Sequence, residues 1–249
     1  MKDNTQRSAV SGETSQQSIM QPSEHKHKGK NIRKIAIAVA VIAIIALPVW
    51  GLSVTKNEQA PPAVEEDNAC EGTINGYEYV DLGLSVKWAT CNVGASSPEE
   101  YGDYYAWGET EVKGRYIEGN CKTWEKNIDD IKGTARDVAH VKWGGTWRMP
   151  TKDEFNELLD YCTWTWTTKN GVEGGKFTSL RNGKSIFLPA AGDWDGISHS
   201  GAGSRGRYWS STPDVSYTQY AYYLYFDSGY RDSGWYYRYC GRSVRPVSE

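Results

Sequence analysis

Few spacings that indicate catalysis or metal binding occur in this 249-residue chain after residue 54. His140 and His199 are the only histidines there and no CxxC pair occurs, so the spacing does not favour a His/Cys zinc site. No set of Ser, His and Asp, and no paired carboxylates, points to nucleophilic or acid–base catalysis. Asp193 and Asp195 share a turn and could offer oxygens to calcium, but two carboxylates without further ligands are a weak signal. We therefore expect no enzymatic activity, no cofactor and no bound metal.

Tyrosine is the abundant residue that could serve a function. The chain holds 17 Tyr and 11 Trp against 4 Phe, and ten of the tyrosines lie in residues 208–239. Tyr provides rigid, amphipathic contact area, and interspersed Ser and Gly let a surface adapt to its ligand. The predicted ligand-binding residues are Tyr217, Tyr220, Tyr222, Tyr223, Tyr225, Asp227, Tyr230, Arg231, Asp232, Trp235, Tyr236, Tyr237, Tyr239, Cys240 and Arg242.

The backbone that carries these residues is expected to be a strand followed by a loop. Residues 220–226 (YAYYLYF) read as a strand, and the face with Leu224 and Phe226 is expected to be buried. Tyr223 and Tyr225 would then be the better-exposed pair, with Tyr220 and Tyr222 at the rim. Residues 227–237 lack an apolar period and are expected to form a loop or hairpin tip. The alternative is that the tyrosines of the strand belong partly to the core.

Short aromatic and β-branched runs between Gly-rich turns predict further strands. The expected strands are residues 77–83, 86–94, 104–108, 186–191, 220–226 and 236–247. One helix is strongly indicated after Pro150, because Thr151 and Glu154 form a capping box and apolar residues follow at helical spacing up to Cys162. A weaker helical turn is expected over residues 134–141. Many short strands with few helices predict the α+β class.

Other conspicuous side chains are expected to be structural. Arg148 and Arg245 should make internal salt bridges or backbone contacts. Five cysteines are present; Cys70, Cys91, Cys121 and Cys162 could form two disulfides in an exported domain or remain free thiols, and Cys240 is the odd one. The residues expected in the core are Trp143, Trp147, Trp209, Leu188 and Pro189.

The N-terminal part predicts membrane anchoring. Residues 1–34 form a polar tail with 7 Lys and Arg against 3 Asp and Glu, and residues 35–54 are 20 uncharged, mostly apolar residues, long enough for a transmembrane helix. The positive charge predicts a cytoplasmic N-terminus and a periplasmic or extracellular C-terminal domain. A cleaved signal peptide is the rival interpretation. Residues 55–70 read as a linker, and residues 71–249 as one exported domain.

Charge argues against two classes of partner. The whole chain has a net charge of −3, and residues 55–249 hold 21 Lys and Arg against 28 Asp and Glu. A domain with this acidic balance is not expected to bind nucleic acid or to cling to an anionic membrane surface.

Six sequence blocks together resemble a known family. They are residues 79–95, 101–110, 143–159, 186–192, 206–212 and 241–247. In this order they are similar to the Fibrobacter succinogenes major paralogous domain of Bacteroidota exported proteins. The resemblance implies a C-type-lectin-like fold of the branch shared with the formylglycine-generating enzyme. Blocks 206–212 and 241–247 also resemble variable proteins of diversity-generating retroelements, in which adenines of the C-terminal gene segment are replaced and the altered residues form a ligand-binding face.

Residue usage agrees with adenine-directed change in a variable region of about 205–245. Asn occurs 11 times up to Asn182 and never after it, and Lys occurs 16 times up to Lys184 and never after it, although six Arg follow. Asn and Lys codons begin with two adenines. Tyr, Ser, Asp, Gly, Arg and Cys can all be reached from an Asn codon, so Cys240 needs no structural partner. Trp235 cannot be reached from an Asn codon, but it can be reached from a Lys codon.

The sequence thus favours a membrane-anchored binding protein with a diversified C-terminal surface and a protein or other cell-surface ligand. A fixed-ligand adhesin or structural envelope protein of the same fold is the alternative. A formylglycine-generating type of oxidase is disfavoured, because the resemblance implies a reactive cysteine pair in the C-terminal region and only Cys240 is there. The EPN and QPD triplets of calcium-dependent lectins are absent, so the fold does not imply sugar binding.

Overall fold

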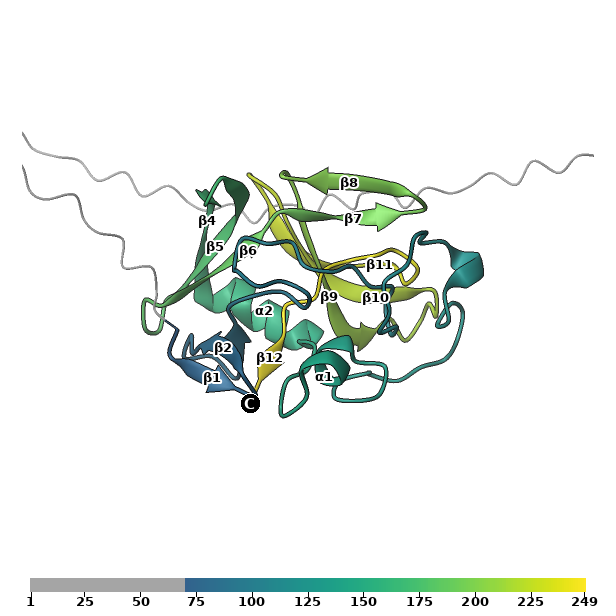
Figure 1. Ribbon diagram of the computed structural model, residues 1–249, viewed down its shortest axis with the longest axis horizontal. Coiled ribbons are helices and arrows are strands. Elements are labelled where there is room, and N and C mark those ends of the chain that lie inside the picture. Colours follow the sequence, from purple (N-terminus) through teal and green to yellow (C-terminus); the bar gives the residue numbers. More distant parts are fainter. Residues whose placement is uncertain (1–69) are drawn as a thin grey trace, which may run out of the picture. The chain divides into compact units, whose positions relative to one another are not determined.

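A computed structural model describes residues 70–249 (Figure 1). The expected cytoplasmic tail, transmembrane segment and all but the last residue of the expected linker lie outside the described residues. Within residues 70–249, none of the helices is long and apolar enough to cross a membrane.

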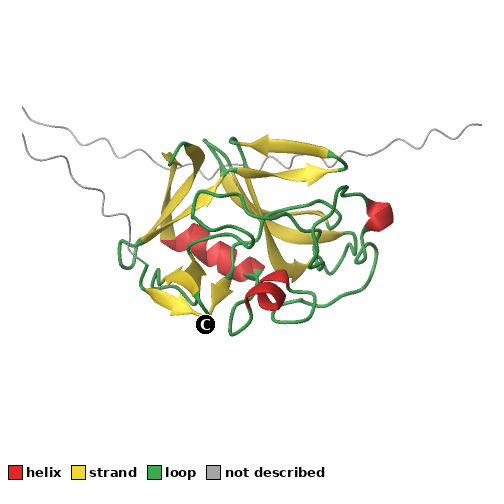
Figure 2. Cartoon of the chain, viewed as in Figure 1, coloured by secondary structure: helices red, strands yellow, loops and turns green. Residues whose placement is uncertain are grey.

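Twelve strands, two α-helices and one short 3-10 helix make up the described part, which is mostly β-structure with few helices (Figure 2). In chain order they are β1 (Gly72–Ile74), β2 (Tyr77–Val80), β3 (Lys87–Ala89), the 3-10 helix (Glu118–Asn120), α1 (Val138–Trp143), α2 (Lys152–Tyr161), β4 (Cys162–Lys169), β5 (Val172–Ser179), β6 (Ser185–Pro189), β7 (Ala191–Asp195), β8 (Ser198–Ala202), β9 (Gly206–Pro213), β10 (Tyr220–Phe226), β11 (Arg231–Tyr237) and β12 (Val247–Ser248).

The strands form four small sheets with antiparallel pairing. Their orders are β1-β2-β3-β12, β11-β10-β9, β4-β5-β6 and β7-β8. The last strand, β12, pairs with β3, with Val247 opposite Trp88. This pairing places the C-terminal end beside the first strands of the domain (Figure 1).

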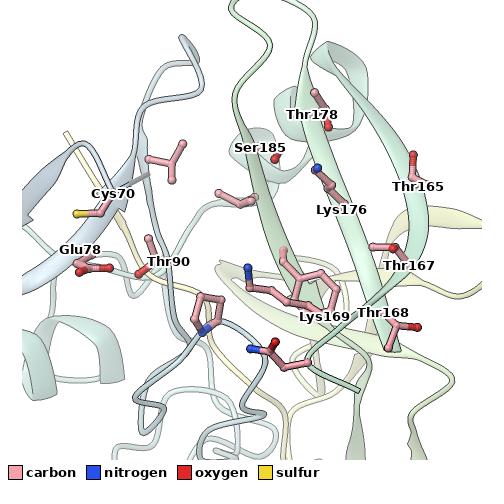
Figure 3. Close-up of a pocket in the computed structure, with 15 residues that line it drawn as sticks. Cys70, Glu78, Thr90, Thr165, Thr167, Thr168, Lys169, Lys176, Thr178 and Ser185 are labelled. Atoms are coloured by element: carbon pink, nitrogen blue, oxygen red, sulfur yellow. The ribbon is translucent and has the colours of Figure 1, made fainter. Parts of the chain in front are cut away.

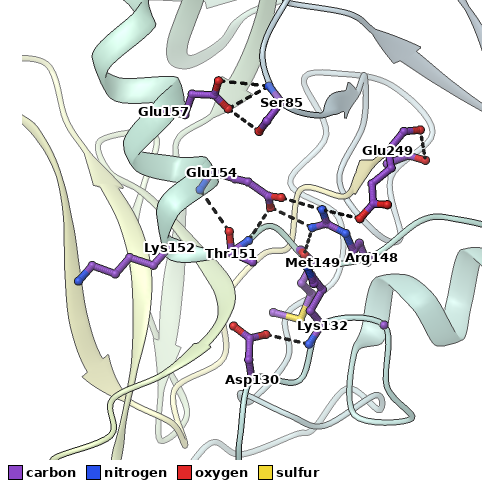
Figure 4. A network of polar contacts seen from close by, with 12 residues as sticks. Ser85, Asp130, Lys132, Arg148, Met149, Thr151, Lys152, Glu154, Glu157 and Glu249 are labelled. Atoms are coloured by element: carbon purple, nitrogen blue, oxygen red, sulfur yellow. Dashed lines mark hydrogen bonds and ion pairs between the residues drawn. The ribbon is translucent and has the colours of Figure 1, made fainter.

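Helix α2 begins where the capping box predicts. The Thr151 hydroxyl accepts a hydrogen bond from the Glu154 amide (3.2 Å), and the Glu154 carboxylate accepts one from the Thr151 amide (2.8 Å). Arg148 reaches the same carboxylate with both terminal nitrogens, at 2.6 and 2.9 Å (Figure 4). Phe155 and Leu158 of α2 are buried against the sheets. The predicted helix is therefore confirmed, and Arg148 makes the expected internal salt bridge.

Two hydrophobic clusters form the core, and strand β10 contributes to both. Leu224 and Phe226 belong to the cluster that contains Phe155 of α2, whereas Ala221 belongs to the cluster around Trp209. Trp143, Trp147, Leu188 and Pro189 are buried as predicted. Leu224 and Phe226 are buried as expected, but Ala221 on the other face is buried too. The expectation of an exposed second face is therefore wrong, because β10 contributes to both clusters.

Several expected boundaries also differ. Residues 231–237 are a strand, not a loop, because their backbone pairs with β10 over seven positions, and only residues 227–230 form the tip. In residues 104–108 only Tyr105 makes a bridge, to Arg242, and most of residues 238–246 is not strand. The weak helical turn is α1, which starts at Val138 after its N-cap Asp137.

All five cysteines of the sequence are free thiols in the described part of the chain, so neither of the two possible disulfides is present. Cys121, Cys162 and Cys240 are buried, and Cys70 is exposed.

Candidate ligand-binding surface

The tip of the β10–β11 hairpin is held by one aspartate. One carboxylate oxygen of Asp227 accepts hydrogen bonds from the amides of Gly229 and Tyr230, both at 2.9 Å, and the other accepts one from the Tyr225 hydroxyl at 2.7 Å. Burial, followed by this hydrogen bond, raises the pKa of Tyr225 to about 12. The hydrogen bond to Asp232 at 2.7 Å, followed by burial, likewise raises the pKa of Tyr230 to about 12. The tip therefore presents Tyr230 from a fixed turn.

One end of the hairpin carries a continuous group of aromatic side chains, here called the aromatic ridge. Tyr220 stands directly opposite Tyr237 in the register, with ring centroids 4.8 Å apart, and its ring lies 4.7 Å from that of Trp235. The Tyr237 and Tyr239 rings stack at 5.4 Å. The ridge consists of Trp124, Tyr217, Tyr220, Trp235, Tyr237 and Tyr239.

The ridge is open because helix α2 covers only the other end of the same hairpin face. There the Ser233 hydroxyl contacts Asn156 of α2 at 2.6 Å, and the ammonium of Lys152 lies 4.0 Å from the Tyr222 ring centroid. On the ridge, Tyr217 is 59% exposed and Trp235 is 40% exposed. Large exposed aromatic area of this kind is typical of an interaction surface.

The opposite face of the hairpin rests on a buried arginine. The guanidinium of Arg242 lies 3.9 Å from the Tyr223 ring centroid, 4.6 Å from that of Tyr236 and 4.5 Å from that of Trp209. Its charge is paired with the Asp193 carboxylate at 3.2 Å, and Arg207 pairs with the other oxygen of that carboxylate. This stack supports the rings of Tyr223 and Tyr236 from beneath.

The prediction of a ligand-binding role is therefore corrected for two residues. Arg242 and Cys240 are both fully buried, so neither side chain touches a ligand at the surface. Arg242 is retained inside because Asp193 and three rings surround it, and the Cys240 thiol packs in the cluster around Trp209. Burial raises the pKa of Cys240 to about 12, which leaves little thiolate for chemistry.

The remaining predicted residues are brought together on the hairpin and in the turns before and after it, but they are exposed to unequal degrees. Tyr217, Tyr230, Asp232 and Trp235 are exposed. Tyr223 and Tyr225 were expected to be the better-exposed pair of the strand. They are instead half-buried, because Trp209 lies against Tyr223 and Arg207 lies against Tyr225. The other half-buried members are Tyr220, Tyr222, Asp227, Arg231, Tyr236, Tyr237 and Tyr239.

Sequence reasoning missed the residues that the first half of the domain adds to this surface. Trp124 joins the ridge with its ring 5.8 Å from that of Tyr237 and 5.4 Å from that of Tyr239. Asn156 and Trp164 stand beside the tip. No local motif marks these three residues, because only the fold brings them to the hairpin.

Two cavities are large enough to receive a side chain or a small ligand. A cavity of about 580 Å³, here called the tip cavity, lies at the start of β11 and is lined by Asn156, Leu159, Asp160, Trp164, Gly229, Tyr230, Arg231 and Asp232. A cavity of about 680 Å³ is lined by β2, β4, β5 and β6 and by neighbouring turns (Figure 3). The second is walled by Thr165, Thr167, Lys176 and other residues outside the predicted binding set.

Metal chemistry has little support in the described part of the chain. Residues 70–249 hold no group of three or more His, Cys, Asp and Glu side chains placed to bind a metal ion. Asp193, considered as a calcium ligand, is engaged by Arg207 and Arg242. The arrangement around the hairpin is thus that of a contact surface made of aromatic rings and flanked by carboxylates.

The described domain is mostly antiparallel β-structure with few helices, and it carries this aromatic surface on the β10–β11 hairpin. A family model, that of the Lcl C-terminal domain, matches residues 79–248, which is nearly the whole of the described domain. The chain belongs to the Lcl C-terminal domain family. Neither the curated proteins nor the solved structures contain a significant match to this chain.

Proposed function

We propose that this protein is a membrane-anchored, exported binding protein whose β10–β11 hairpin is diversified by a retroelement to meet changing protein or other cell-surface ligands. The observation that carries this proposal is the aromatic ridge. Its exposed rings come almost wholly from the segment that lacks Asn and Lys, and membership of the Lcl C-terminal domain family is consistent with a variable, adhesin-like domain. The C-type-lectin-like fold is part of the proposal and is supported by the six sequence blocks.

The hairpin suits diversification because its architecture does not depend on the exposed rings. Leu224 and Phe226 anchor β10 in one cluster, Ala221 anchors it in the other, and Arg242 supports the inner face. Side chains such as Tyr217 and Trp235 can change without opening the core, since they pack on other ridge rings. The structure therefore divides the segment into framework positions and replaceable positions.

Deep sequencing of the gene segment for residues 205–249 in one growing population tests the proposal, with the segment for residues 70–180 as internal control. We expect variation at adenine positions of a template repeat, concentrated at Tyr217, Tyr220, Trp235 and Tyr237. Codons of Leu224 should stay constant. An invariant segment would favour the fixed-ligand adhesin or structural protein.

The anchor is tested separately. We expect the full chain to remain with membranes after alkaline extraction, and the domain from residue 71 onward to be digested by protease added outside the cytoplasmic membrane. Release of a shortened, soluble chain would favour a cleaved signal peptide.

Absence of enzymatic activity is also part of the proposal. The burial and high pKa of Cys240 argue against a reactive cysteine in the C-terminal region. Copper-dependent oxidation of a thiol peptide by the purified protein would overturn this part.

A further inference from the structure

Strand β11 is an edge strand, and the phase of its hydrogen bonds shows which backbone groups face outward. The Arg238 amide donates to the Gln219 carbonyl (2.9 Å), and the Asp227 amide donates to the Tyr230 carbonyl (2.8 Å). In an antiparallel pair, residues alternate between bonding to the partner and pointing away from it. The even-numbered residues of β11 therefore pair with β10, and Arg231, Ser233 and Trp235 direct their amides and carbonyls to the open edge.

The open edge is only partly closed by the chain itself. The Ser233 amide donates to the side chain of Asp232 at 2.8 Å, and the Tyr237 carbonyl accepts from the Cys240 amide at 3.2 Å. Within residues 70–249, the outward amide and carbonyl of Trp235 have no protein partner. Exposed edge groups of this kind are a template for another extended chain.

Side chains at both ends of the edge are placed to receive those of such a chain. Trp235 and Tyr237 of the aromatic ridge stand at one end. The tip cavity lies at the other, and Asp160, Asp232 and Trp164 are among its lining residues. Arg231 is the cation there, and its guanidinium lies 5.7 Å from the Trp164 ring centroid. The two acidic residues outnumber this single cation, so the negative balance at the cavity favours a basic side chain.

We propose that β11 binds an extended polypeptide segment as an added strand, with a Lys or Arg side chain of the ligand in the tip cavity and an apolar side chain on the ridge. This inference rests on the proposed binding function and specifies the ligand class as polypeptide. Backbone hydrogen bonds would supply affinity that survives side-chain change, while the replaceable rings set specificity. Such a division suits a surface whose side chains vary.

The probe is a linear dodecapeptide selected from a displayed random library on the full chain in detergent micelles. We expect selected peptides to carry Lys or Arg. Methylating single peptide amides should weaken binding about tenfold or more at every second residue and little between, because only alternate amides face β11. Amide hydrogen exchange should slow at Trp235 on binding. A selection that yields no linear peptide, or a methylation profile without alternation, would overturn strand addition.

Variants of the protein distinguish the contribution of the β11 backbone to binding from that of its side chains. Trp235→Pro removes the outward amide and the ring, whereas Trp235→Ala removes only the ring; we expect Pro to weaken binding about tenfold more than Ala. Asp160→Asn should weaken the binding of a basic peptide several-fold. The matched control Asp153→Asn, on the same helix but outside the tip cavity, should leave this binding unchanged. Equal effects within either pair would overturn the proposal.

Failure of strand addition and failure of the proposed function give different results. If Tyr217→Ser and Tyr220→Ser weaken peptide binding but the effect of amide methylation does not alternate along the peptide, the ridge binds ligand without strand pairing. If these variants leave binding unchanged, the ridge is not the site. A dimer of the free protein that already protects the Trp235 amide would show that a second copy, not a ligand peptide, occupies the edge.

Discussion

Replacing Asp193 by alanine tests whether the buried arginine stack supports the binding hairpin. The side chains of Asp193 and Arg242 are 5% and 1% exposed, and the Arg242 guanidinium lies against three aromatic rings. Asp193→Ala leaves that guanidinium buried without its counter-charge. Removing one partner of a buried ion pair costs about 3–5 kcal/mol of unfolding free energy. With a urea dependence of about 2 kcal/mol per M, the unfolding midpoint should fall by about 2 M.

The assay is urea unfolding followed by tryptophan fluorescence, with Asp195→Ala as the control. Asp195 is exposed on the same strand and forms no salt bridge within residues 70–249, so its replacement should change the free energy of unfolding by less than about 0.5 kcal/mol. The double variant Asp193→Ala with Arg242→Met should recover part of the loss, because the charge of Arg242 is then no longer buried without a partner, while Arg207 still lacks its partner. A loss below about 1 kcal/mol in Asp193→Ala would refute the idea that this ion pair supports the hairpin.

Three further results are expected. Burial acts to raise the pKa of Glu154, but hydrogen bonds from Arg148 and from the Thr151 amide outweigh it and lower the pKa below 4.5. The ionised Glu154 carboxylate therefore stabilises the fold above pH 4.5, and this stabilisation is lost as the pH falls through the folded-state pKa. In Glu154→Gln, the free energy of unfolding should depend less on pH in that range. In a spectrophotometric titration, Asp232→Asn should lower the pKa of Tyr230 from about 12, whereas an unchanged value would contradict the hydrogen bond as its main cause. A thiol reagent at neutral pH should label Cys70 rapidly in the native protein and reach three cysteines only after unfolding, namely Cys121, Cys162 and Cys240.

Local signals in the sequence predicted the elements that depend on neighbours along the chain. The capping box of Thr151 and Glu154 defines the start of α2, since both of its hydrogen bonds join residues three apart. Strand β10 lies at its predicted residues because a run of mostly aromatic residues there is bounded by turn residues. The concentration of tyrosine and the absence of Asn and Lys distinguish the hairpin segment in the sequence alone.

Tertiary structure alone decided which of those residues face outward. The residues of strand β11 do not alternate between apolar and polar types, so the sequence pattern did not predict a strand there. The strand forms because its backbone pairs with β10 at the edge of the sheet. Arg242 and Cys240 carry no sequence mark of burial; Asp193 and the ring of Trp209, 49 and 33 residues before Arg242, hold that guanidinium inside. Trp124 joins the ridge from a distant turn. Composition thus distinguished the segment that is proposed to bind ligand, while long-range packing decided which of its side chains are exposed.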